Sequence, residues 1–191
     1  MRVYFSRMTK HEQLVELLAT RSARTGEFTL ASGARSNLYI DARMTAMSPE
    51  GLALIGPLAL GELRLAGWKA DSVGGLTLGA DPISYAIAYA SALAETPVRA
   101  FTVRKEAKTH GTGKLIEGPF LPSDRVVVIE DVITTGGSAL KAIHAIQSAG
   151  ASVIGVLSLV DREEGGKERI ETEGYSVRSL ATAAEIIPRI K

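Results

Sequence analysis

The chain has 191 residues, 46% of them hydrophobic, and a formal net charge of +1. This length suffices for the core of one domain, and the near-neutral charge argues against a nucleic-acid or membrane-surface binder. The absence of cysteine excludes disulfides, thiolate metal sites and a cysteine nucleophile. The sequence shows neither a signal-like N-terminus nor an apolar stretch of membrane length, so we expect a cytoplasmic protein with no nucleic-acid or membrane partner.

The first half of the chain predicts three helices and one segment of irregular strands. Leucines at helical spacing indicate a helix over residues 10–24. Residues 28–43 alternate polar and apolar side chains, which indicates a short hairpin or irregular strands. Helices over residues 48–66 and 81–93 each begin with a serine or aspartate followed by proline, which is the pattern of a capped helix start.

Four apolar segments predict strands. Their continuous apolar character indicates burial on both faces, as in a parallel sheet covered by helices. Right-handed crossovers between such strands give an α/β, doubly wound parallel sheet, and ligands are expected at the carboxyl ends of its strands. The segments are residues 72–74, 98–103, 126–129 and 153–160, and we expect the fourth to be the last core strand.

A segment without helical pattern, residues 104–124, interrupts the alternation of strands and helices. A long loop of this kind inside a compact domain is usually functional, often as an active-site lid. Several cations on one loop suit a polyanion such as pyrophosphate, although a solvated basic loop is the alternative. The basic residues of this lid are Arg104, Lys105, Lys108, His110 and Lys114.

The most specific pattern lies in residues 126–138, where an apolar run is followed by Glu130 and Asp131 and then by a turn rich in threonine and glycine. A helix predicted over residues 139–149 follows at once. The unpaired N–H groups at its start suit a phosphate, and the two adjacent carboxylates suit the vicinal hydroxyls of a ribose. The pattern therefore indicates a sugar phosphate, with an ordinary glycine-rich turn as the alternative. It has neither the lysine of a P-loop nor a G-x-G-x-x-G motif.

This segment resembles the signature for 5-phosphoribosyl pyrophosphate (PRPP) in type I phosphoribosyltransferases. Residues 28–166 as a whole resemble the orotate-using members, whose reaction converts PRPP and orotate into orotidine 5′-monophosphate and pyrophosphate in pyrimidine (UMP) synthesis. The resemblance implies a single domain with an N-terminal hood (about 1–45), a core (about 46–191) and a flexible lid (about 104–124). It also implies a homodimer whose lid is shared across subunits. Mg²⁺ would be bound mainly through PRPP, with no metal site made by protein side chains alone.

The resemblance assigns roles to three sets of residues. Lys108, Glu130 and Asp131 are the expected catalytic residues. Orotate is expected at Thr134 and Arg162. The residues expected to bind PRPP are Arg104, Lys105, Lys108, His110, Glu130, Asp131, Val132, Ile133, Thr134, Thr135, Gly136, Gly137 and Ser138.

A second glycine-rich turn, residues 74–82, resembles the pyrophosphate-binding loop of the family. Many relatives carry a lysine at the Ala31 position and some carry one near Leu78, and both lysines are absent here. Tyr39 is interpreted either as core or as part of the hood over the base, and Thr109 is given no role.

Two alternative functions share the PRPP signature. A phosphoribosyltransferase for another base should lack this lid and Arg162, and a non-catalytic PRPP-sensing regulator should lack the lid cations. Lys105, Lys108 and His110 together favour the orotate enzyme.

Overall fold

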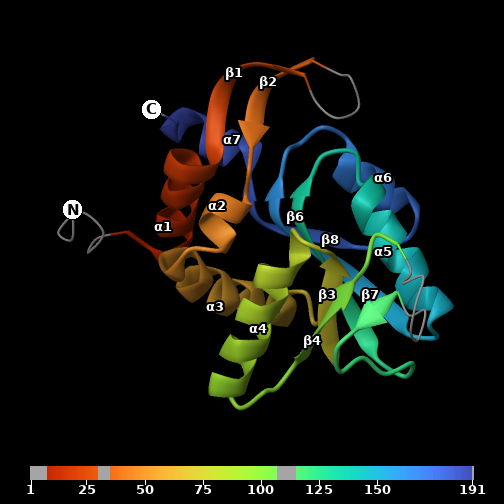
Figure 1. Ribbon diagram of the computed structural model, residues 1–191. Coiled ribbons are helices and arrows are strands. Elements are labelled where there is room, and N and C mark those ends of the chain that lie inside the picture. The colour runs from red at the N-terminus through yellow and green to blue at the C-terminus, as the bar shows by residue number, and fades with distance from the viewer. Residues whose placement is uncertain (1–7, 30–34, 107–114, 191) are drawn as a thin grey trace.

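The computed structural model describes residues 8–29, 35–106 and 115–190. Its centre is a six-stranded sheet in the order β5-β4-β3-β6-β7-β8 (Figure 1). All neighbouring strands are parallel except β5, which pairs antiparallel with β4. The strands are β3 (Ser72–Leu76), β4 (Arg99–Val103), β5 (Ile116–Glu117), β6 (Arg125–Ile133), β7 (Ser152–Asp161) and β8 (Val177–Thr182).

The central strand β6 shows why the sheet forms. Val126, Val127, Val128 and Ile129 are all fully buried. Val127 and Ile129 pack in one core cluster, and Val126 and Val128 pack in another on the opposite face. The two-residue period of a strand therefore places apolar side chains in both layers, as predicted for a doubly wound sheet.

Helices cover both faces of this sheet (Figure 1). The first core cluster contains residues from α1, α3 and α4, and the second contains residues from α5 and α6. Ser48 caps α3 as predicted, since its hydroxyl accepts a hydrogen bond of 3.1 Å from the Gly51 N–H. The helices are α1 (Lys10–Leu17), α2 (Arg43–Ala46), α3 (Pro49–Leu65), α4 (Ala80–Leu93), α5 (Gly137–Ser148), α6 (Gly166–Thr172) and α7 (Ala183–Ile186).

The N-terminal segment forms a hairpin above the carboxyl edge of the sheet (Figure 1). α1 continues as a π-helical turn, Leu18–Ser22, and strand β1 (Ala23–Thr29) then pairs antiparallel with β2 (Arg35–Ile40). The predicted helix over residues 10–24 is therefore two residues too long, because the extended backbone begins at Ala23.

Two further predictions about strands and helices are wrong. β7 is not the last core strand, because the chain continues through α6 into β8 and ends in α7 and a 3₁₀ turn, Ile187–Arg189. β8 includes Arg178, Ser179 and Thr182, so it lacks the apolar run by which the other strands were found. Asp81 does not cap α4: the cap position is Gly79, and no side chain caps the helix.

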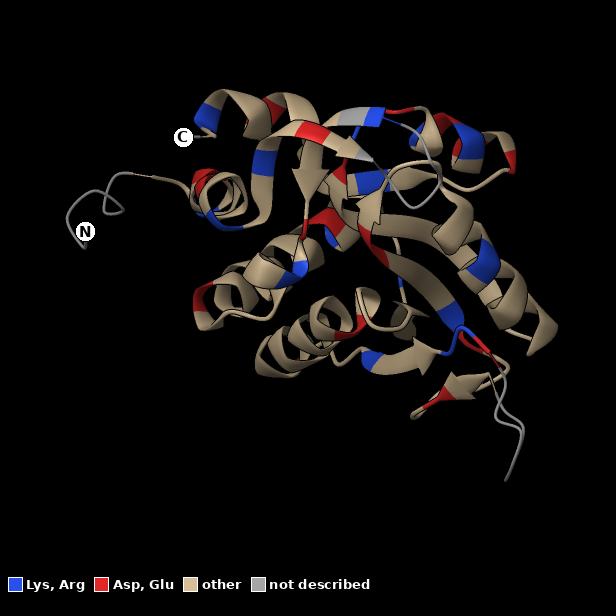
Figure 2. Ribbon diagram, turned by 45° about the horizontal axis from the view of Figure 1, so that its top comes forward, with Lys and Arg blue, Asp and Glu red and all other residues tan. Residues whose placement is uncertain are grey.

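No helix among residues 8–29, 35–106 and 115–190 is long and apolar enough to cross a membrane. Figure 2 shows acidic and basic residues interspersed over these parts of the fold, in keeping with the net charge of +1.

Candidate active site

A cavity of about 280 Å³ lies at the carboxyl edge of the sheet. Five parts of the chain meet there: the end of β2 with the turn into α2, the end of β3 with the loop into α4, the segment after β4, the end of β6, and the first turn of α5. The predicted site residues that line it are Lys105, Glu130, Asp131, Val132 and Ser138. The other lining residues are Tyr39, Ile40, Asp41, Ala42, Arg43, Leu76, Thr77, Leu78 and Gly79.

The turn from β6 into α5 presents an open helix N-terminus. Gly136 occupies the cap position with φ of 74°, a left-handed conformation that favours glycine, and no side chain caps the helix. The first N–H groups of α5 therefore remain available to an anion, and Ser138 lies beside them at the cavity. This geometry suits the phosphate that the sequence predicts for residues 134–138.

α6, which the sequence analysis missed, packs directly against this turn. A Cβ atom on Gly166 would lie 2.3 Å from the Thr134 carbonyl oxygen, so only glycine permits this approach. Arg169 donates a hydrogen bond of 3.1 Å to the Thr135 carbonyl. The Gly165-Gly166 dipeptide was the available sequence signal for this contact.

Glu130 and Asp131, the acidic pair, differ in their surroundings. Glu130 is buried, and burial, with the neighbouring Asp131 carboxylate second, raises the pKa of Glu130 well above its usual value of 4.5. Its buried Oε2 has no hydrogen-bond partner among the described residues. Asp131 is half-buried, and its Oδ1 accepts a hydrogen bond of 2.9 Å from the Val132 N–H. Both acids therefore line the cavity, but Glu130 is the more deeply buried of the two.

The loop between β3 and α4 approaches Asp131 very closely. A Cβ atom on Gly79 would lie 2.3 Å from Asp131 Oδ2, so a larger residue would displace the carboxylate. The buried Asp81 fixes this loop, because it accepts hydrogen bonds from Thr77 (2.6 Å) and Thr102 (2.9 Å). The Thr77–Leu78 peptide bond is cis. Asp81 thus positions the loop instead of capping the helix, a role that only the three-dimensional contacts reveal.

The lid is described only at its two ends. Lys105 lines the cavity, whereas Arg104 pairs with Glu117 of β5 at 3.1 Å and does not line it. Lys108 and His110, like Thr109, Lys114 and Ala31, lie outside the described residues, so their predicted roles stay predictions.

Arg162 is not among the residues that line the cavity. Its side chain is buried and donates hydrogen bonds to the Leu38 carbonyl (3.0 Å) and to Glu164 (2.6 Å). Its backbone N–H bonds to the Ile133 carbonyl at 3.0 Å. Arg162 therefore joins the hairpin to the ends of β6 and β7, and its predicted contact with orotate stays a prediction.

The other predicted residues of the β6–α5 turn do not line the cavity with their side chains. Ile133 lies in the core, and Thr134 is half-buried near Gly166. Thr135 is exposed, while Gly136 and Gly137 offer backbone alone. Tyr39, in contrast, lies at the cavity with 41% of its surface exposed, so the interpretation of Tyr39 as core is wrong.

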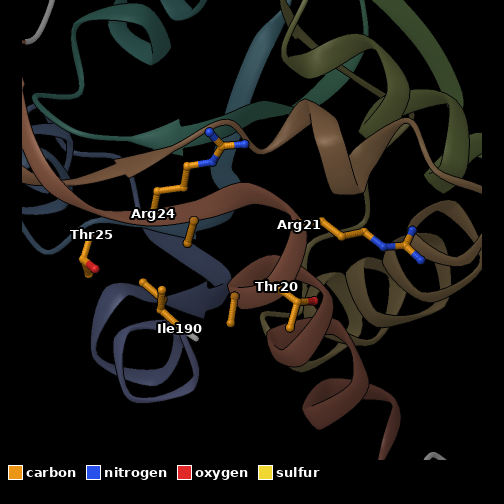
Figure 3. A pocket seen from close by; sticks show the side chains of 7 residues that line it. Thr20, Arg21, Arg24, Thr25 and Ile190 are labelled. Atoms are coloured by element: carbon orange, nitrogen blue, oxygen red, sulfur yellow. The ribbon is translucent and has the colours of Figure 1, made fainter. Parts of the chain in front are cut away.

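A larger cavity, of about 470 Å³, lies between the π-helical turn, β1 and Ile190 (Figure 3). None of the predicted site residues lines it. The Arg21 side chain extends away from Ile190 and pairs with Glu50 at 2.9 Å (Figure 3). We assign the site to the smaller cavity, because the acidic pair and the open end of α5 meet there.

Comparison with known proteins gives a consistent family. A family profile for the phosphoribosyl transferase domain matches residues 47–183. The orotate phosphoribosyltransferase of Aquifex aeolicus is 47% identical over 183 residues, which cover 94% of this chain and 99% of that protein.

Two solved structures of Mycobacterium tuberculosis orotate phosphoribosyltransferase are also similar. The complex with Fe(III) dicitrate is 43% identical with a TM-score of 0.82, and the complex with PRPP is 40% identical with a TM-score of 0.79. Each alignment covers 93% of this chain and 99% of the other. With the sheet order, the hairpin and the glycine-rich turn at the carboxyl edge, these matches show that the chain belongs to the orotate phosphoribosyltransferases of the type I phosphoribosyltransferase family.

Proposed function

We propose that the chain transfers the phosphoribosyl group of PRPP to orotate, giving orotidine 5′-monophosphate and pyrophosphate in pyrimidine biosynthesis. The observation that carries this proposal is the meeting of the acidic pair and the open end of α5 at one cavity. The 47% identical relative is named for this activity, and a 40% identical relative has been solved with PRPP bound.

The reaction needs positioning and charge stabilisation more than it needs a protein nucleophile. The bond between C1′ and the pyrophosphate oxygen breaks with its electron pair going to pyrophosphate, and N1 of orotate forms the new bond to C1′. Residues 134–138 hold the 5′-phosphate at the start of α5. Glu130 and Asp131 hold the ribose hydroxyls, and the negative charge of Asp131 stabilises positive charge on the ring.

The lid stabilises the leaving group. Arg104, Lys105, Lys108 and His110 neutralise the departing pyrophosphate and exclude water from the cavity. Lys105 supports this role by its position at the cavity. Orotate lies toward Thr134 and Arg162, where a cation suits its carboxylate.

Mg²⁺ fits this site as an ion carried by the substrate. The described residues contain no group of three or more histidine, cysteine or acidic side chains that could hold a metal ion. In this proposal PRPP oxygens would supply most of the ligands. When bound, the ion neutralises pyrophosphate charge.

The active unit in this proposal is a homodimer in which each lid completes the partner's site. An exposed stripe on α4 supports it: Tyr85, Tyr89 and Leu93 are spaced four residues apart and are 54%, 70% and 70% exposed. Tyr85 also contacts Thr102 at 3.1 Å, next to the root of the lid. A second copy packed on this stripe would lie beside the lid.

Refolding two impaired variants together tests the shared lid. Lys108→Ala and Asp131→Asn chains, mixed equally, should form about half hybrid dimers, and one site in each hybrid then carries neither defect. Activity should recover to about a quarter of wild type. A mixture that is no more active than its parent variants, with hybrids confirmed by native mass spectrometry, contradicts a lid shared across subunits.

The reaction itself is tested by the loss of orotate absorbance in the presence of PRPP and Mg²⁺. Hypoxanthine, adenine and uracil serve as control bases. We expect turnover with orotate and with none of the three control bases. Turnover with another base would favour a different phosphoribosyltransferase, and PRPP binding without turnover of any base would favour a regulator.

A further inference from the structure

The loop between β3 and α4 has no basic side chain, although it resembles a pyrophosphate-binding loop. Its residues between β3 and Asp81 are Thr77, Leu78, Gly79 and Ala80, of which Leu78 is 53% exposed at the cavity. A pyrophosphate group carries several negative charges, and backbone N–H groups leave these charges uncompensated. The lid cations and Mg²⁺ of the proposed mechanism supply part of the compensating charge, and a further cation at this side of the cavity would add to it.

Among the described residues, two basic side chains line the cavity. Lys105 belongs to the root of the lid, and Arg43 stands at the start of α2, below the hairpin. Arg43 lines the same cavity as Gly79 and Asp131, so the cavity brings this cation and the β3–α4 loop together. The PRPP signature, residues 126–138, assigns no binding role to Arg43. Arg43 lies more than 80 residues before the signature in the chain.

Asp41 holds the Arg43 guanidinium in a defined orientation. Nε donates to Asp41 Oδ1 at 2.7 Å and Nη2 donates to Oδ2 at 2.9 Å, which is a bidentate pair. These hydrogen bonds to Asp41 raise the pKa of Arg43, and the charge of Asp131 adds to this effect. Nη1 has no partner among the described residues. The side chain is thus fixed on one edge while its other N–H donors remain available.

The free edge of the Arg43 guanidinium can donate hydrogen bonds to an anionic ligand. Asp41 occupies Nε and Nη2, and about half of the Arg43 side chain is exposed. Arginine with a preorganised planar fork loses little side-chain freedom when it binds phosphate oxygens. The nearby acids, Glu130 and Asp131, are expected to face the ribose, so they do not compete for the same group.

We propose that Arg43, oriented by Asp41, binds the pyrophosphate group of PRPP in place of the lysine that the β3–α4 loop lacks. This inference rests on the proposed function, because it takes PRPP as the substrate. Asp41 is a positioning residue in this scheme: it touches Arg43 and not the ligand.

Pyrophosphate binding measures this contact apart from catalysis. Magnesium pyrophosphate is titrated calorimetrically into the wild type and into Arg43→Ala, Arg43→Lys and Asp41→Asn. Loss of a charge-assisted contact should weaken binding about tenfold or more in Arg43→Ala. Arg43→Lys should recover part of the loss, because it keeps the charge without the fork, and Asp41→Asn should fall between Arg43→Ala and the wild type.

The matched control is Arg125→Ala. Arg125 forms the same kind of bidentate pair, with Asp71 at 2.9 and 3.0 Å, but at the amino end of β6, away from the cavity. This variant should bind magnesium pyrophosphate as the wild type does. Circular dichroism melting of all variants separates a loss of folding from a loss of binding.

Steady-state kinetics distinguish a failure of the Arg43 proposal from a failure of the proposed function. The Michaelis constant for PRPP should rise in Arg43→Ala while that for orotate changes little. If Arg43→Ala binds pyrophosphate like Arg125→Ala, or if only the orotate constant rises, Arg43 does not hold pyrophosphate. If the wild type itself neither binds magnesium pyrophosphate nor consumes orotate, the proposed function fails instead.

Discussion

Acidic residues lie near both ends of strand β6, but those near the amino end have hydrogen-bond partners in the protein and Glu130 at the carboxyl end lacks one at its Oε2 within the described part of the chain. At the amino end, Arg125 donates two side-chain hydrogen bonds to Asp71 and lowers the pKa of that carboxyl to about 2. Asp124, next to it, is buried but bonds to both Arg99 and Ser72. At the carboxyl end, burial raises the pKa of Glu130, and its Oε2 has no hydrogen-bond partner among the described residues.

This contrast separates the structural acids beside the amino end of β6 from the ligand-binding acids at its carboxyl end. A carboxylate whose oxygens are all satisfied within the protein favours the folded state and has nothing left to offer a ligand. A buried carboxyl that lacks donors opposes folding, and it persists where a ligand supplies the missing hydrogen bonds. A buried polar atom without a hydrogen-bond partner at the carboxyl edge therefore identifies the site better than the volumes of the two cavities do.

The largest expected effect is the loss of activity in Asp131→Asn. The amide replaces an acceptor-only carboxylate that faces the ribose hydroxyls, so kcat/KM for PRPP should fall about tenfold to a hundredfold. The matched change is Asp71→Asn, because Asp71 pairs with Arg125 at the amino end of β6, and it should leave kinetics unchanged. Steady-state assays measure kcat/KM for PRPP in both variants and compare them with the wild type. Equal activities would show that the two ends of β6 do not differ in function.

A second effect should follow from crowding Asp131. Gly79→Ala places a Cβ atom where the Asp131 carboxylate lies, so that carboxylate must move and kcat/KM should fall up to about tenfold. Gly61→Ala, in α3, is the control because a Cβ atom added there would meet nothing within 4 Å, and it should leave activity unchanged. Comparable losses in both variants would contradict a specific effect on Asp131.

Glu130→Gln should stabilise the fold in a pH-dependent way. The folded-state pKa of Glu130 is raised, so the folded protein holds a proton that the unfolded chain releases above pH 4.5, and wild-type stability falls as pH rises from there. Glutamine removes this cost, and the melting temperature at pH 7 should rise by about 2 to 4 °C. Melting curves of the variant and the wild type between pH 4.5 and 8 measure this difference. A difference that is constant with pH would mean that Glu130 does not titrate as described.

The smallest effect is expected from Asp71→Asn on stability. The lowered pKa of Asp71 means that its pair with Arg125 stabilises the fold above pH 3.8 and that this contribution is lost as pH falls toward 2. Both side chains are at least a third exposed, and water screens them, so the melting temperature at pH 7 should drop by only about 1 to 3 °C. A loss larger than the gain from Glu130→Gln would reverse the order of these effects.

Local patterns in the sequence predicted much of the fold. Ser48-Pro49 marked the start of α3, and the apolar run of β6 marked the centre of the sheet, because capping and burial depend on neighbouring residues. β8 escaped notice because its polar residues break the apolar run. An edge strand keeps part of its surface outside the core, so composition alone does not reveal it.

The candidate site was predictable only in part, for a similar reason. Glu130, Asp131 and the following turn form one continuous motif, and the structure brings the acids and Ser138 to one cavity. Arg43 and Gly79 come from distant segments, and their approach to Asp131 depends on how the hairpin and the β3–α4 loop pack. Such contacts are long-range and leave no periodic signal in the sequence.

The most direct test is a crystal structure of the chain with PRPP and Mg²⁺. We predict PRPP in the cavity at the carboxyl edge, with its ribose hydroxyls within hydrogen-bond distance of Glu130 and Asp131 and its 5′-phosphate on the first N–H groups of α5. PRPP bound instead in the larger cavity beside Ile190, or bound without contact to the acidic pair, would contradict this assignment.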